Sequence, residues 1–100
     1  MSSIDQETLA LSQALIRLNT VDPPGNELAA ARIVETVLAS AGIASELISI
    51  GEGRSNLLAR VKGSGEHKDL VYSAHFDTIP AEPDEWTHSP FGGDVVGNRL

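Results

Sequence analysis

The chain has 100 residues, which suits at most one modest domain, and its 41% hydrophobic and 21% charged residues are typical of a soluble globular protein. A net charge of −7, with only seven Lys and Arg, argues against a surface for nucleic acid or an anionic membrane. The absence of cysteine excludes disulfides and Cys-based zinc sites, so any metal must be bound by histidine and carboxylates.

Two amphipathic helices are predicted in the first half of the chain. Leucines and alanines spaced three to four residues apart predict the first helix over about 5–18. The prolines at 23–24 forbid a continuing helix because they lack backbone N–H groups, and the Gly-Asn pair that follows offers turn and cap chemistry. A cleaner period predicts the second helix from about Asn26, with Gly42 as its left-handed cap.

Apolar segments bounded by glycine predict a β-meander in the middle of the chain. Its three strands are expected over 43–50, 56–62 and 69–75. Glycine-rich turns over 51–55 and 63–66 separate them. Residues 77–93 are too rich in proline, glycine and acids to be regular, so they form a long loop that is functional or mobile.

The two ends of the chain carry different signals. Residues 1–7 lack the positive region and apolar core of a secretory signal, and no apolar run is long enough to span a bilayer, so a cytoplasmic location is expected. Gly97 and Asn98 indicate a tight turn between two strands, only the first of which is present. Because Val95 and Val96 then lack a partner strand, residues 1–100 are expected to be the front part of a longer protein.

The most informative motif lies at 73–80, where His75 and Asp77 follow an apolar run. In an extended strand both side chains project to one face while Phe76 packs on the other. Ligands of α/β sheets gather at the carboxyl ends of strands. A neutral imidazole is a good zinc ligand, and a carboxylate commonly orients it. A His-x-Asp tripeptide also arises by chance, so a purely structural role stays open for both residues.

Two patches in order along the chain match the motifs of a known family. The first reads H-x-D-x-V-P and then W-x-x-x-P-F in the family, and matches here at His75, Asp77, Pro80, Trp86, Pro90 and Phe91. Ile79 and Ala74 are mild departures from it. The second patch spans 20–27 and contains Pro-Pro-Gly-Asn-Glu at 23–27, which matches the start of the family's second helix. The chain therefore resembles the zinc metallopeptidase and amidohydrolase family that includes acetylornithine deacetylase, succinyl-diaminopimelate desuccinylase, aminoacylase and glutamate carboxypeptidase.

This resemblance implies an α/β fold in which residues 1–100 are the N-terminal portion of a three-layer α/β/α metal-binding catalytic domain. It implies a metal-dependent hydrolase of amide bonds in N-acyl amino acids or small peptides, with two Zn²⁺ ions that Co²⁺ or Mn²⁺ could replace. His75 is then a metal ligand and Asp77 a catalytic residue that supports it. The other ligands and the general base would lie beyond Leu100, so the 100 residues alone should be inactive and bind zinc weakly.

Two other interpretations of the sequence stay open. One is a non-catalytic α/β module with an incidental His-x-Asp, and the other is a family member that binds without cleaving. A homodimer would form through a domain absent here, with no nucleic-acid or membrane partner.

Trp86 and Phe91 are expected to anchor the long loop on the core. Arg54 or Arg99 could pair with a substrate carboxylate. The residues expected at the surface are His67, His88, Glu82, Asp84 and Glu85.

Overall fold

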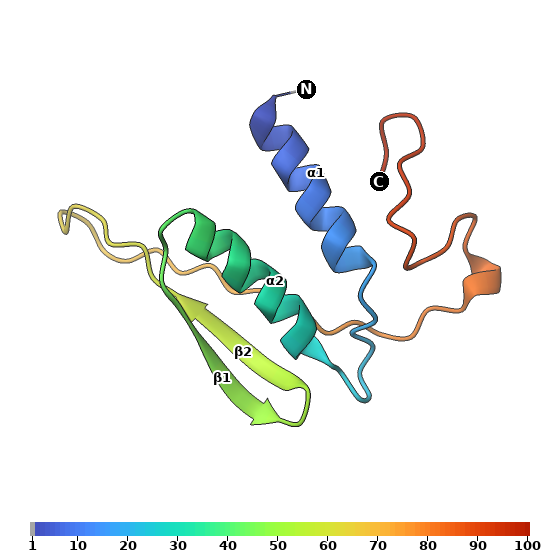
Figure 1. Ribbon diagram of the computed structural model, residues 1–100, viewed down its shortest axis with the longest axis horizontal. Coiled ribbons are helices and arrows are strands. Elements are labelled where there is room, and N and C mark those ends of the chain that lie inside the picture. The colour runs from blue at the N-terminus through green and yellow to red at the C-terminus, as the bar shows by residue number, and fades with distance from the viewer. Residues whose placement is uncertain (1) are drawn as a thin grey trace.

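The computed structural model of the chain describes residues 2–100 (Figure 1). Its elements are helix α1 (Ser3–Ile16), helix α2 (Glu27–Ser40), strand β1 (Ser45–Gly51), strand β2 (Arg54–Ala59) and a short 3₁₀-helix η1 (Pro83–Glu85). Both predicted helices and the first two predicted strands are therefore present, with bounds shifted by a few residues. The α/β class is confirmed. No helix within residues 2–100 is long and apolar enough to cross a membrane.

A capping box sets the start of α1 ahead of the predicted position. The Ser2 hydroxyl accepts a hydrogen bond from the Asp5 N–H at 3.1 Å, and the Asp5 carboxylate accepts one from the Ser2 N–H at 2.9 Å. These bonds satisfy two backbone donors that the first turn leaves free. The Ser2 hydroxyl and N–H both donate to the ionised carboxylate, which lowers the pKa of Asp5.

The two ends of α2 are built differently. Asn26 at its N-cap is left-handed, with φ 56°, and its side chain makes no capping hydrogen bond, which corrects the expected cap chemistry. The free N–H of Leu28 instead donates to the Gly53 carbonyl at 3.0 Å, so the β1–β2 turn caps the helix. At the other end Gly42 has φ +75°, as predicted for a left-handed cap.

Strands β1 and β2 form an antiparallel hairpin under α2 (Figure 1). Ser45 pairs with Ala59 and Ile48 with Asn56, and the register shifts beyond Ser49 near the turn. The third strand expected over 69–75 is missing from the described chain, so the predicted meander ends as a two-stranded sheet. A strand requires a neighbour to take its backbone hydrogen bonds, and among residues 2–100 no backbone group hydrogen-bonds with 69–75.

The described residues enclose little core. They expose 8078 Å² of surface, whereas a folded monomer of this mass is expected to expose about 5,500 Å². The buried hydrophobic residues among 2–100 are Ala30 and Ala31, while Leu70, Val71 and Tyr72 are 77%, 80% and 90% exposed. In Figure 1 the segment after β2 extends well past the helices. Many large apolar side chains that could form a core are therefore exposed here.

The segment after residue 77 is irregular apart from η1, as predicted, and it returns to α1. The Gln13 amide donates to the Gly93 carbonyl at 2.8 Å, and Arg17 Nε donates to the Gly92 carbonyl at 3.1 Å. The C-terminal residues accordingly lie beside α1 in Figure 1. The predicted turn at Gly97 is confirmed, because Val96 and Arg99 exchange backbone hydrogen bonds across it.

Candidate functional site

The connector between α1 and α2 runs beside the segment that carries the His-x-Asp motif. The Thr78 N–H donates to the Thr20 carbonyl at 3.1 Å, and the Asp22 N–H donates to the Thr78 carbonyl at 2.9 Å. Val21 and Thr78 thus form an isolated parallel bridge. Two segments more than fifty residues apart in sequence are therefore held side by side at the candidate site.

The side chain of Thr20 adds a third hydrogen bond between these two segments. Thr20 is buried, with 4% of its surface exposed, and its hydroxyl lies 2.7 Å from the Phe76 carbonyl oxygen. A carbonyl can only accept, so the hydroxyl is the donor. With the bridge at Thr78, this bond holds the backbone on both sides of Asp77.

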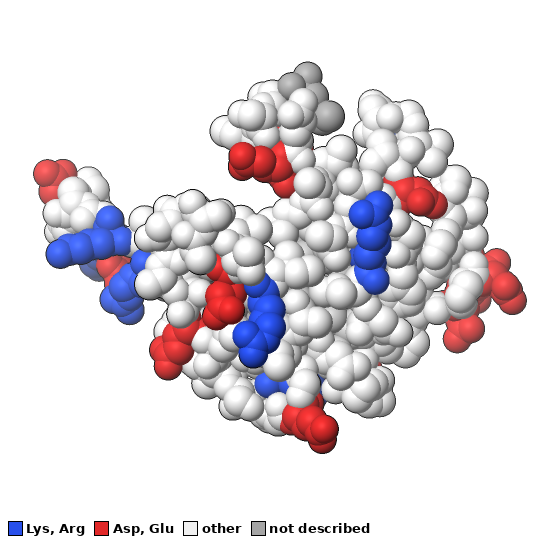
Figure 2. Space-filling model, in the orientation of Figure 1, with Lys and Arg blue, Asp and Glu red and all other residues white. Residues whose placement is uncertain are grey.

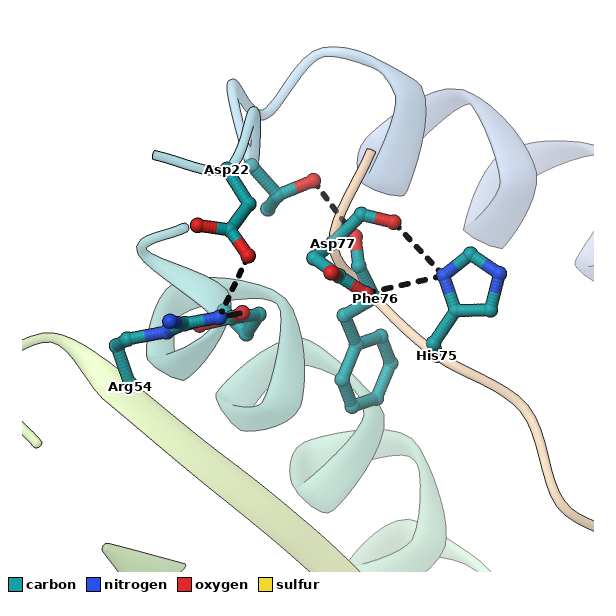
Figure 3. A network of polar contacts seen from close by, with 7 residues as sticks. Asp22, Arg54, His75, Phe76 and Asp77 are labelled. Atoms are coloured by element: carbon teal, nitrogen blue, oxygen red, sulfur yellow. Dashed lines mark hydrogen bonds and ion pairs between the residues drawn. The ribbon is translucent and has the colours of Figure 1, made fainter. Parts of the chain in front are cut away.

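His75 and Asp77 are in direct contact (Figure 3). Nδ1 of His75 lies 2.8 Å from the backbone carbonyl oxygen of Asp77 and 3.1 Å from its carboxylate Oδ1. Because the carbonyl oxygen can only accept, Nδ1 carries a proton, and in the neutral imidazole Nε2 then keeps its lone pair. Nε2 lies on the ring edge away from Asp77 in Figure 3, and the His75 side chain is 82% exposed. This is how a ligating histidine is commonly held by an orienting carboxylate.

The two residues line an open hollow of about 430 Å³ together with Asp22, Thr78 and Ile79. Within residues 2–100, however, no three His, Asp or Glu side chains lie close enough to hold a metal ion. A catalytic zinc site needs three protein ligands. The described chain thus fits a metal at one ligand position, Nε2 of His75, with the carboxylate that orients it, and does not complete a site.

Beside the hollow, Arg54 is engaged by two acids (Figure 3). Its guanidinium bonds the Glu27 carboxylate through both Nε and Nη2, and Nη2 also donates to Asp22 Oδ2 at 3.3 Å. Donation from Arg54 lowers the pKa of Glu27, and the same bonds from the two acids raise the pKa of Arg54. Arg54 is therefore engaged by two acids within the protein, and its pairing with a substrate carboxylate stays a prediction.

Sequence reasoning found the segment 20–27 as a matching patch but not what it contacts. Thr20 was not singled out, and neither was the ion pair of Glu27 with Arg54. Local spacing gives no signal for either, because the partners lie 56 and 27 residues apart. For the ion pair, the opposite charges of Glu27 and Arg54 were the only available hint, and charge alone does not identify a partner.

The remaining candidates lie away from this site. The five residues expected at the surface are exposed: His67, His88, Glu82, Asp84 and Glu85. Trp86 is 55% exposed, so the expectation that it packs on the core is wrong. Phe91 is half-buried and, with Pro23, Pro24 and Pro80, lines a second hollow of about 330 Å³. Of the two residues predicted to anchor the loop, Phe91 thus lines a hollow shared with the α1–α2 connector, whereas Trp86 is exposed.

Charge is spread rather than gathered on the face of the molecule shown in Figure 2. On the face shown in Figure 2, the Lys and Arg side chains lie singly or in small groups among acidic and uncharged ones. Binding to a nucleic-acid backbone draws on clustered basic residues. That face offers no continuous surface of this kind, and the absence of a nucleic-acid partner stays a prediction.

The chain is similar to curated proteins named succinyl-diaminopimelate desuccinylase. It is 32% identical over 100 residues to that of Rhodopseudomonas palustris, covering 95% of this chain and 25% of the relative. It is 38% identical over 101 residues to that of Methylorubrum extorquens, covering 96% of this chain and 25% of the relative. The chain thus spans about a quarter of the length of the curated relatives it matches. No family model and no solved structure matches it.

Proposed function

Because the chain belongs to the family that includes succinyl-diaminopimelate desuccinylase, we propose that it is the N-terminal portion of a catalytic domain that hydrolyses amide bonds. The matched region extends over nearly the whole chain, and the relatives are named as desuccinylases. The proposed substrates are small N-acyl amino acids or peptides. An N-succinyl amino acid is the first to test, since that acyl group appears in the relatives' name.

The proposed fold of the whole domain is a three-layer α/β/α sandwich. Its support is the exposed apolar surface of Leu70, Val71 and Tyr72, which has strand composition but no neighbouring strand among residues 2–100. Other parts of the protein would supply the missing strands and layers. A cytoplasmic location and a homodimer formed through a separate domain belong to the same proposal.

The proposed chemistry begins at His75, and the observation that carries it is the contact of its Nδ1 with Asp77. Asp77 fixes the tautomer and the ring direction, so that Nε2 is free to bind a divalent metal. Zn²⁺ is proposed, with Co²⁺ or Mn²⁺ as alternatives, and when bound it supplies Lewis-acid catalysis that polarises the scissile carbonyl and lowers the pKa of water. The other ligands and the general base would come from outside this chain.

Replacing His75 in the complete protein tests this proposal. His75→Ala should lower both the bound metal and the hydrolysis of an N-succinyl amino acid by more than about 100-fold, since losing only the outer partner of a ligand costs about 10–100-fold. Asp77→Asn keeps the backbone carbonyl but not the charge, and should lower the rate by about 10–100-fold. Metal analysis of the purified protein and a hydrolysis assay give the two readouts.

The matched control is His67→Ala, which removes an exposed histidine remote from the hollow and should leave both readouts at the wild-type level. If His75→Ala also leaves both unchanged, the metal role of His75 is refuted and the reading as a module with an incidental His-x-Asp is favoured. A wild-type protein that binds metal but hydrolyses no N-acyl amino acid would be a member that binds without cleaving.

A further inference from the structure

Thr20 carries a buried hydroxyl that the proposed chemistry does not use. Its acceptor is the carbonyl of Phe76, the residue that separates His75 from Asp77. Among residues 2–100, no other donor contacts that carbonyl. A hydroxyl from the α1–α2 connector is thus the only described group that fixes the direction of this peptide in the middle of the candidate site.

The peptide group that links Phe76 to Asp77 is planar, so fixing its carbonyl also fixes the backbone N–H and Cα of Asp77. Both acceptors on Nδ1 of His75 belong to Asp77: its backbone carbonyl at 2.8 Å and its carboxylate at 3.1 Å. If the peptide rotated, the two acceptors would move together and the imidazole would lose the partner that determines its tautomer.

The backbone bonds at Thr78 do not make the hydroxyl redundant. They hold the chain after Asp77, through the Thr78 N–H and carbonyl, whereas the hydroxyl holds the chain before it. Burial raises the cost of losing this bond, because the Phe76 carbonyl would be left without a donor beside a buried side chain.

We propose that Thr20 is a positioning residue, whose hydroxyl orients the peptide between Phe76 and Asp77 and through it keeps the His75 imidazole in the tautomer that leaves Nε2 free. The part of this proposal that concerns metal affinity rests on the proposed function. The part that concerns the imidazole does not, because the contacts described above exist without a metal.

The test uses the complete protein with Thr20→Val, which keeps the shape and removes the hydroxyl, and Thr20→Ser, which keeps the hydroxyl. In the metal-free protein, the side-chain ¹⁵N resonances of His75, assigned by their loss in His75→Ala, report the tautomer. Wild type and Thr20→Ser should show the proton on Nδ1, and Thr20→Val a mixture of both tautomers. Co²⁺ titration followed by visible absorption should show affinity about 10–100-fold weaker for Thr20→Val and near wild type for Thr20→Ser.

A merely structural Thr20 would give a different result. Thr20→Val would then unfold at a lower temperature, while the folded protein kept the wild-type tautomer and Co²⁺ affinity, and the proposal would be overturned. It is overturned equally if Thr20→Ser behaves like Thr20→Val. If Thr20→Val does not fold, Thr20→Ala removes the hydroxyl without placing a methyl against the carbonyl. Should wild type bind no Co²⁺, the proposed function fails, and the tautomer alone decides the role of Thr20.

Discussion

Gly25 occupies a position where a side chain would displace its neighbours. Its φ is +101°, and a Cβ built there would lie 2.7 Å from Nε of Arg54 and 2.8 Å from Oε1 of Glu27. The sequence indicates that this glycine lies in a turn, because it follows two prolines and comes just before a helix. The structure adds that the missing side chain leaves room for the ion pair next to the candidate site.

Replacing Gly25 with alanine should therefore cost more than the backbone conformation alone. Gly42→Ala is the matched control, because Gly42 also has positive φ, +75°, but its Cβ would meet nothing within 4 Å. We expect Gly42→Ala to lose about 1–2 kcal/mol for the left-handed backbone, and Gly25→Ala to lose clearly more. Denaturant unfolding of the complete protein measures both, and equal losses would contradict the packing explanation.

At the scale of elements, one ion-pair network joins the first turn of α2 to the start of β2 and to the connector. Glu27 lies in α2, Arg54 begins β2 and Asp22 lies between α1 and α2. Donation from Arg54 lowers the pKa of Glu27 in the folded protein. The network therefore stabilises the fold above the unfolded pKa of a glutamate, about 4.3, and that stabilisation is lost as the pH falls through the lower folded pKa.

Glu27→Gln should reveal this dependence on pH. At pH 7 it should lower the free energy of unfolding by about 1–3 kcal/mol, because the buried carboxylate loses hydrogen bonds from a charged donor. The difference from wild type should begin to shrink as the pH falls below the unfolded pKa of a glutamate, about 4.3, and should disappear as the pH falls through the lower folded pKa of Glu27, where the wild-type side chain is protonated as well.

The control for this element is Glu35→Gln, which removes an exposed pair with Arg32 at 3.8 Å and should cost under about 0.5 kcal/mol. Thermal and denaturant unfolding of the complete protein at pH 7 and at acid pH give the comparison. A loss for Glu27→Gln that stays the same at both pH values would show that its charge is not what stabilises the junction.

At the scale of the whole molecule, the described residues are open rather than closed around a core. Their radius of gyration is 15.7 Å, whereas a compact domain of 100 residues has about 13 Å. The apolar segment 69–75 lies on the surface without a partner strand. These properties support the proposal that the rest of the protein completes this domain.

Expressed alone, the 100 residues should bind Zn²⁺ weakly, hydrolyse no N-acyl amino acid and bind a dye specific for exposed apolar surface. In the complete protein, backbone amides in 69–75 should exchange with solvent slowly, because neighbouring strands would then take their hydrogen bonds. Hydrogen exchange, dye fluorescence and zinc titration on both proteins make the comparison. A compact, zinc-binding and active 100-residue chain would contradict the proposed division.

Much of the local structure could be predicted from the sequence. Helices α1 and α2, the β1–β2 hairpin and the left-handed Gly42 follow from periodicity, turns and caps. The sequence also contains His75 and Asp77 two positions apart in one motif. All of these depend on interactions between residues a few positions apart, which local propensity and side-chain spacing record.

Only the tertiary structure decided the rest. It showed that 69–75 has no neighbouring strand here, that Arg54 is engaged by Glu27, and that Thr20 reaches the peptide beside Asp77. It also determined which nitrogen of His75 is left free. These outcomes depend on residues tens of positions apart, and no local pattern records which distant segments the fold brings together, because that is decided by the packing of the whole chain.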